Sequence, residues 1–70
     1  MMPLTLADIG KTEIIKRVGG GEEQKRFLEN LGFVPGSEIT LVSKIAGNVI
    51  VNVKESRVAI SEVLAQKIMV

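Results

Sequence analysis

Apolar residues recur at every second position in three runs in the second half of the chain, 38–43, 49–53 and 57–60: Ile39 and Leu41, then Val49, Val51 and Val53, then Val58 and Ile60. A period of two is typical of strands that bury one face and expose the other. A loop over residues 44–48, which contains Gly47-Asn48, and the polar pair Lys54-Glu55 separate these runs, and connections of this kind favour hairpins. The pattern therefore predicts a three-stranded antiparallel meander.

A helical period precedes the meander. Four residues fall at positions i, i+3, i+4 and i+7, which form one stripe on a helix: Gln24, Phe27, Leu28 and Leu31. We expect the apolar members of this stripe to pack on the sheet. Gly32 follows the stripe directly, where a glycine commonly ends a helix in a left-handed conformation.

Turn-forming residues then connect the helix to the meander. Pro35-Gly36 is expected to form the centre of a type II turn, because Pro suits the second position of that turn and Gly the third. After the meander, Ser61 is expected to cap one helical turn over residues 61–65. Residues 68–70 predict a last short strand.

The first eighteen residues carry weaker patterns. Thr5 to Asp8 has the spacing of a capping box, and Gly10 would end the resulting single turn. Thr12 to Val18 is rich in β-branched residues and predicts a strand. The adjacent Ile14 and Ile15 break its alternation, so a bulge or cover on both faces is expected.

The expected order is strand, helix, meander, helical turn and strand. About five short strands in so small a chain must curl to bury one shared face, and closure also protects the sheet edges. The prediction is a mainly β fold with one inserted helix, built as a small and partly open barrel. Seventy residues allow a single domain, spanning 1–70.

The amino-acid composition excludes several kinds of catalytic and metal-binding site. The chain contains no Cys, His, Trp or Tyr, and its net charge is +1. It therefore lacks thiol and imidazole groups for metal binding or for acid–base catalysis at neutral pH. No apolar run approaches the roughly 18 residues that a membrane span needs, and no signal peptide is visible. We expect a cytoplasmic protein that is neither an enzyme nor inserted in a membrane.

Several segments together resemble one known family. They are Leu4 to Asp8, the triple glycine 19–21, Leu31 to Gly36, Ile39, Val42, Ile50 to Val53, Arg57 to Ile60, Ala65, Ile68 and Val70. In this order, and over nearly the whole chain, the series is similar to the FeoA family, the ferrous-iron-transport accessory protein A.

The resemblance implies an SH3-like barrel with an inserted helix, in agreement with the hydrophobic pattern. It also implies an accessory or regulatory protein of ferrous iron uptake. Its partner would be the cytosolic domain of FeoB, a membrane ferrous-iron transporter. Two positions depart from the family pattern: members often have Gly at Glu55 and Pro at Val49, so the loops near these residues are expected to differ.

Two glycine motifs are weak candidates for ligand sites. Gly10-Lys11-Thr12 resembles the end of a phosphate-binding P-loop, but the motif needs an earlier glycine where this chain has Thr5. It must also open a helix, whereas a strand is expected here. Gly19-Gly20-Gly21 could present backbone N–H groups to an anion, but Glu22 and Glu23 would repel the anion.

Charged residues leave further alternatives open. The 8 acids show none of the spacings that a metal site requires, so no cofactor or metal site is predicted. Weak binding of a divalent ion, ferrous iron included, or a metal-sensing role stays open. Six basic residues could form a nucleic-acid surface: Lys11, Lys16, Arg17, Lys25, Arg26 and Lys44. The lack of Tyr and Trp argues against stacking on single strands, and no nucleic acid is expected as partner.

The candidate partner-binding surface combines the charged face of the helix with the corner that follows it. Its residues are Glu22, Lys25, Arg26, Glu29, Phe33 and Pro35. An ordinary solvated face is the simplest alternative. Strand addition at an exposed sheet edge is another. The oligomeric state does not follow from the sequence.

Overall fold

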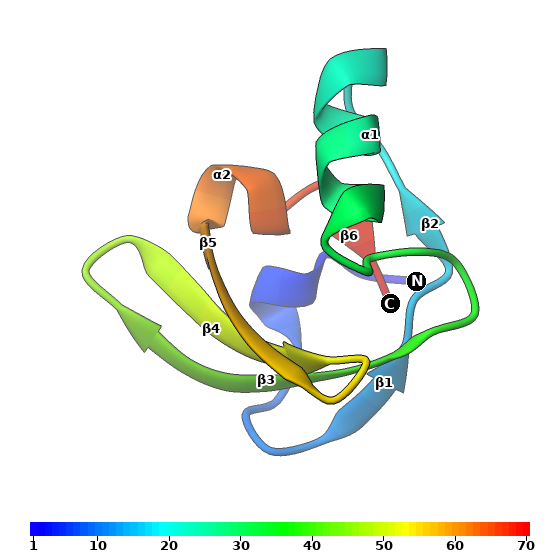
Figure 1. Ribbon diagram of the computed structural model, residues 1–70. Coiled ribbons are helices and arrows are strands. Elements are labelled where there is room, and N and C mark those ends of the chain that lie inside the picture. Colours follow the sequence, from blue (N-terminus) through cyan, green and yellow to red (C-terminus); the bar gives the residue numbers. More distant parts are fainter.

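A computed structural model describes residues 1–70 and contains two antiparallel sheets (Figure 1). The predicted meander is confirmed as β3 (Glu38–Ile45), β4 (Asn48–Val53) and β5 (Ser56–Ser61). Together with β1 (Thr12–Ile14), these strands form a four-stranded sheet in the order β1-β3-β4-β5. The buried residues of β3 and β4 alternate as the sequence pattern predicts, so one face of this sheet covers the core.

The second sheet brings the two ends of the chain together. It consists of β2 (Arg17–Val18) and β6 (Ile68–Met69), which pair antiparallel. Beside β6, the N–H of Met2 donates to the carbonyl of Val70 at 2.9 Å, and the N–H of Val70 donates back at 2.8 Å. The two termini therefore lie side by side, as Figure 1 shows.

The single strand expected over residues 12–18 is instead divided between the two sheets. Between β1 and β2, the N–H of Ile15 donates to the carbonyl of Ser37, and the carbonyl of Ile15 accepts from Gly36. Ile14 is 45% exposed and Ile15 only 1% exposed. The adjacent isoleucines mark the point where the chain leaves one sheet for the other. Neither the expected bulge nor cover on both faces of a single strand is needed to explain them.

Helix α1 (Glu22–Asn30) ends as the sequence predicts, at a left-handed Gly32 with φ +104°. The N–H of Phe33 donates to the carbonyl of Leu28, and the N–H of Gly32 donates to that of Glu29, both at 3.0 Å. This bond pair is a Schellman motif. Leu28 is fully buried, but Phe27 is 51% exposed, so the expectation that Phe27 packs on the sheet is wrong. Only a narrow stripe of α1 faces the core.

The turns around the meander use left-handed residues. The N–H of Ser37 donates to the carbonyl of Val34, with Gly36 at φ +92°, which fits the predicted turn. Between β4 and β5, both Lys54 and Glu55 have positive φ, at 49° and 64°. The turn at Glu55 therefore keeps a left-handed backbone without a glycine.

Two short helical elements close the barrel. The 3-10 helix η1 (Leu4–Leu6) starts after Pro3 without a side-chain cap, so the predicted capping box at Thr5 is wrong. Thr5 lies inside the turn, where its hydroxyl cannot cap the start. In α2 (Glu62–Ala65), the hydroxyl of Ser61 accepts from the N–H of Leu64 at 3.2 Å, as predicted.

The core consists of fifteen apolar residues that come from nearly every element, and no polar or charged side chain is buried. Neither helix has the length and apolar content of a membrane-spanning helix. The structure therefore confirms a mainly β architecture with one inserted helix. It has one strand more than expected because residues 12–18 split.

Candidate functional site

The charged face of α1 is exposed as predicted. The side chains concerned are those of Glu22, Lys25, Arg26 and Glu29. None of them takes part in an ion pair, because the one salt bridge joins Lys11 to Glu13 at 3.7 Å on β1. Pro35, in the corner after the helix, is also exposed. These five residues are available to a partner.

Phe33 has to be removed from the predicted surface set. Its side chain is 0% exposed, and it belongs to the core cluster together with Leu28. A Schellman motif commonly brings these two helix-end positions into apolar contact. Phe33 therefore anchors the end of α1 to the barrel and offers no side-chain surface to a partner.

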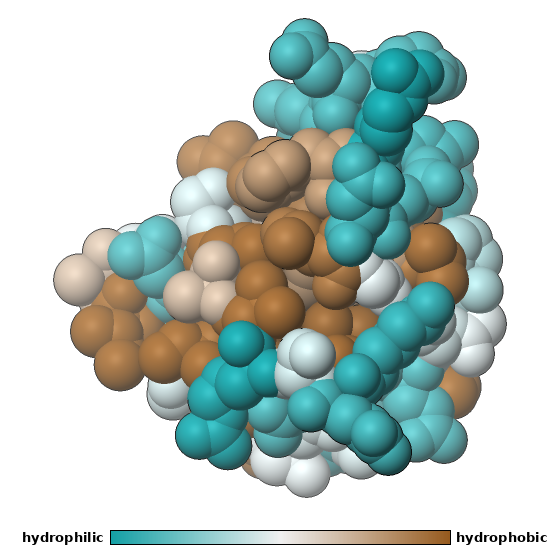
Figure 2. Space-filling view, in the orientation of Figure 1, coloured by the Kyte–Doolittle hydropathy of each residue, from teal (hydrophilic) through white to brown (hydrophobic).

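An apolar area lies on the same side of the molecule as α2. Val63 of α2 is 64% exposed, Ile45 at the end of β3 is 58% exposed, and Leu64 and Val58 are partly buried. The N–H of Glu62 donates to the carbonyl of Gly47, which fixes the start of α2 against the β3–β4 hairpin. Figure 2 shows apolar residues spread over α2, β5 and this hairpin, with the hydrophilic residues of α1 above them. We call this area the apolar face.

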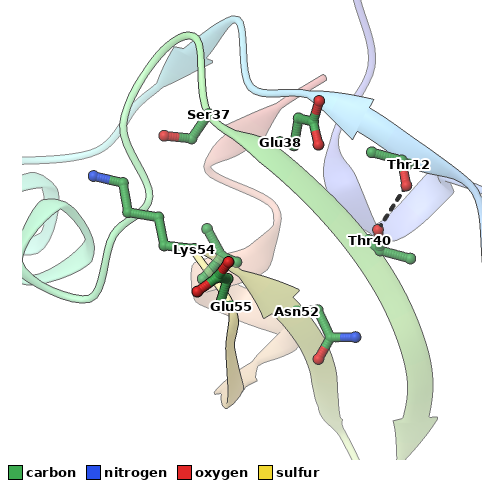
Figure 3. Close-up of a pocket in the computed structure, with 8 residues that line it drawn as sticks. Thr12, Ser37, Glu38, Thr40, Asn52, Lys54 and Glu55 are labelled. Carbon is green, nitrogen blue, oxygen red and sulfur yellow. Dashed lines mark hydrogen bonds between the residues drawn. The ribbon is translucent and has the colours of Figure 1, made fainter.

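A polar hollow lies on the outer side of the four-stranded sheet. Its volume is about 430 Å³, and it is lined by Thr12, Ser37, Glu38, Thr40, Asn52, Val53, Lys54 and Glu55. The hydroxyls of Thr12 and Thr40 are 3.0 Å apart and bonded to each other. In Figure 3, the side chain of Lys54 extends away from Asn52 and Thr40. The hollow is therefore an open surface lined by hydroxyl, amide and carboxylate groups.

The corner after α1 and the β4–β5 turn form one packed unit. A Cβ placed on Gly32 would lie 3.4 Å from Cδ of Lys54, so the lysine stem covers this glycine. Two successive non-glycine residues with positive φ are unusual, and each costs on the order of 1 kcal/mol. The structure holds this turn in a defined conformation at the rim of the hollow.

The structure gives no support to the P-loop, nucleic-acid and metal sites that the sequence analysis considered. Lys11 and Thr12 lead into strand β1 and not into a helix, which contradicts a P-loop. The six basic residues considered for nucleic acid are spread over β1, β2, α1 and β3 and the segments beside them. One of them, Lys44, donates to the carbonyl of Thr5 at 2.6 Å. No group of three or more His, Cys, Asp or Glu residues is placed to hold a metal ion.

Sequence reasoning missed both the apolar face and the hollow. Ile45 and Val63 follow or precede apolar residues whose side chains are buried. Nothing in the sequence therefore marks the side chains of these two residues as exposed. The hollow is lined by residues that lie far apart in the sequence, and only the register of β1, β3 and β4 places Thr12, Thr40 and Asn52 in one row. That register is a property of the folded sheet.

Comparison with known proteins identifies the family. Residues 2–70 match the family described as the FeoA domain. Over 70 residues the chain is 36% identical to a protein of Methanocaldococcus jannaschii that carries the provisional name Fe(2+) transport protein A, and it covers 85% of that protein.

Solved structures share the fold. The crystal structure of an iron uptake regulatory protein (FeoA) superposes with a TM-score of 0.87 at 29% identity, over 97% of this chain and 90% of that one. The zinc complex of FeoA from Stenotrophomonas maltophilia, described as a prokaryotic SH3 domain protein, has a TM-score of 0.84 at 24% identity, over 99% and 88%. The second likeness confirms the SH3-like fold. Because the family match extends over all but the first residue, this chain belongs to the FeoA domain family.

Proposed function

We propose that this protein is an accessory or regulatory factor of ferrous iron uptake that acts by binding the cytosolic domain of an FeoB-type membrane transporter. The family match over residues 2–70 carries this proposal. Two relatives support it by name: the M. jannaschii protein is named for Fe(2+) transport, and the S. maltophilia protein is suggested to be an activating factor of ferrous iron transport.

The apolar face is the surface proposed to dock the transporter. Exposed Val63 and Ile45 supply aliphatic area that water solvates poorly, and burying such area is the main favourable term in most protein association. Exposed apolar patches with a polar rim commonly mark interaction sites. The charged face of α1 lies beside this area and would supply the rim, where charges set orientation and association rate more than affinity.

Rigidity favours this mode of action. Both ends of α2 are held, by the Ser61 cap at the start and by the bond from the Lys67 N–H to the carbonyl of Leu64 at the end. The hairpin beside it is held by the bond between Glu62 and Gly47. A surface that is already ordered loses little conformational entropy when it binds. The protein would therefore present a preformed surface.

In this proposal, iron is the cargo of the transporter, and the accessory chain carries out no chemical step. The chain has neither His nor Cys, which transition metals favour when they bind tightly. Anaerobic calorimetry with Fe²⁺ should give at most weak heats without saturation. A tight, stoichiometric site would contradict this part of the proposal.

The binding experiment is a titration of the purified protein into the isolated cytosolic domain of the transporter. It is carried out with and without guanine nucleotide and Fe²⁺, because the resemblance to the FeoA family implies a partner whose cytosolic domain binds GTP and which transports Fe²⁺. We expect saturable binding in at least one condition. No binding up to about 1 mM in every condition would overturn the proposal, since that corresponds to an interaction too weak to be specific.

A further inference from the structure

Strand β5 leaves one edge of the four-stranded sheet unpaired. Its only neighbour is β4, and Val53 pairs with Ser56 directly beside the two-residue turn. In such hairpins the pair that flanks the turn exchanges both backbone hydrogen bonds, and the pattern then alternates. Ser56, Val58 and Ile60 therefore bond to β4. The N–H and C=O groups of Arg57 and Ala59 point to the free edge, and no other backbone hydrogen bond uses them.

This edge lacks the protection that the other edges have. The edge strand β1 has only three residues, and it carries a charged pair formed by Lys11, just before the strand, and Glu13 within it. Strand β2 has only two residues. Strand β5 has six residues, one charged side chain, no proline and no bulge against β4. Long edges with few charges and no proline readily pair with another strand.

The sequence of β5 is complementary to itself. If two copies pair antiparallel with Ala59 opposite Ala59, then Val58 lies opposite Ile60 of the second copy on the inner side. On the outer side, Arg57 lies opposite Ser61. No like charges meet in this register, and Glu62 follows directly after Ser61 with the sign opposite to Arg57. The hydrogen-bonding groups of Ala59 also face the same groups of the other copy.

We propose that two copies of this chain associate through β5, with a two-fold axis at Ala59, and join their four-stranded sheets into one continuous sheet. In this register no like charges meet, Val58 lies against Ile60 of the second copy, and the hydrogen-bonding groups of Ala59 face their own copies. A two-fold contact requires this match of one surface with itself. The exposed Ala59 is small enough to let the two backbones approach, and the partly buried Val58 gains an apolar neighbour.

The test uses the molar mass in solution, measured by sedimentation equilibrium up to about 1 mM. The wild-type protein should change from the 7.6 kDa monomer to twice that mass as the concentration rises. Ala59→Lys and Ala59→Asp each place like charges opposite each other at the axis. Each variant alone should dimerise at least about tenfold more weakly than wild type. An equimolar mixture of the two should recover the dimer, because Lys then faces Asp.

The matched control is Ser43→Lys, which adds the same charge on β3, away from the free edge, and should dimerise like the wild type. Circular dichroism and thermal unfolding check that each variant is folded. A wild-type protein that stays monomeric at every concentration would overturn the proposal. Dimers that tolerate both Ala59 variants, or a mixture that fails to recover the dimer, would also overturn it. The result is independent of the transporter titration, because no transporter is present.

Discussion

Gly32 shows how a single residue fixes the direction of the chain. Its φ of +104° lies in the region that disfavours side chains, and the stem of Lys54 covers the position where a Cβ would stand. The left-handed conformation lets the N–H of Phe33 reach the carbonyl of Leu28 and carries Phe33 into the core. One glycine therefore connects the end of α1 to both the core and the β4–β5 turn.

Gly32→Ala should lower the free energy of unfolding by about 1–2 kcal/mol, because alanine pays the cost of a left-handed backbone. Urea unfolding followed by circular dichroism measures the change. The matched control is Gly19→Ala, where φ is not positive and the nearest atom, the carbonyl oxygen of Lys67, is 3.6 Å away. The free energy of unfolding of that variant should be unchanged or higher by up to about 0.5 kcal/mol. Equal losses for both variants would contradict the special role of Gly32.

Residues of this kind could be predicted from the sequence because their chemistry is local. Gly32, the Pro35-Gly36 turn and the Ser61 cap each depend on neighbours within a few positions. Phe33 could not be placed in the same way. Its burial depends on packing against Leu28 and the barrel, and the sequence shows only an aromatic residue in a corner.

At the scale of elements, α1 is held to the barrel by very few side chains. Leu28 is its one buried residue, and Leu31 beyond the helix end is only partly buried. The helical period predicted the element but not the width of its buried stripe. That width depends on how closely the helix approaches the barrel, which no local pattern encodes.

Leu28→Ala should lower the free energy of unfolding by about 3 kcal/mol, because it opens a cavity at a fully buried site. Phe27→Ala is the neighbouring control and removes a larger side chain that is 51% exposed. It should cost less than about 1 kcal/mol. Urea unfolding of both variants gives the comparison. A larger loss for Phe27 than for Leu28 would show that the helix packs with a different face.

Among the strands, too, some features could be predicted from the local sequence and others depend on the folded chain. The meander could be predicted because Val49, Val51 and Val53 stand two positions apart and share one face of a strand. The break between β1 and β2 could not, since Ile14 and Ile15 are equally apolar and only the crossing from one sheet to the other separates their environments.

At the scale of the whole molecule, the fold and the surface have different origins. The order of the elements and the barrel could be read from hydrophobic periods and turns, because they reflect how a small chain buries its apolar residues. The apolar face and the hollow arise where separate elements meet. Predicted charges on α1 are exposed, but the exposed aliphatic residues of α2 and β3 appear only in the folded chain.

Both proposed surfaces are properties of the assembled barrel. The apolar face joins α2 to the β3–β4 hairpin, and the free edge belongs to β5, where the sheet remains open (Figure 1). The two surfaces meet at Val58, which belongs to the apolar face and also lies in the proposed contact between two β5 strands, so a transporter domain and a second copy of the chain would compete for this residue.

Binding of the transporter's cytosolic domain by two matched variants tests whether this protein acts by docking its apolar face on the transporter. Val63→Lys places a charge within the apolar face, whereas Ile14→Lys places the same charge at an exposed isoleucine on the edge strand β1. We expect Val63→Lys to weaken binding at least about tenfold, because burying an unpaired lysine is costly, and Ile14→Lys to bind like the wild type. Unchanged binding by a folded Val63→Lys variant would contradict docking through the apolar face.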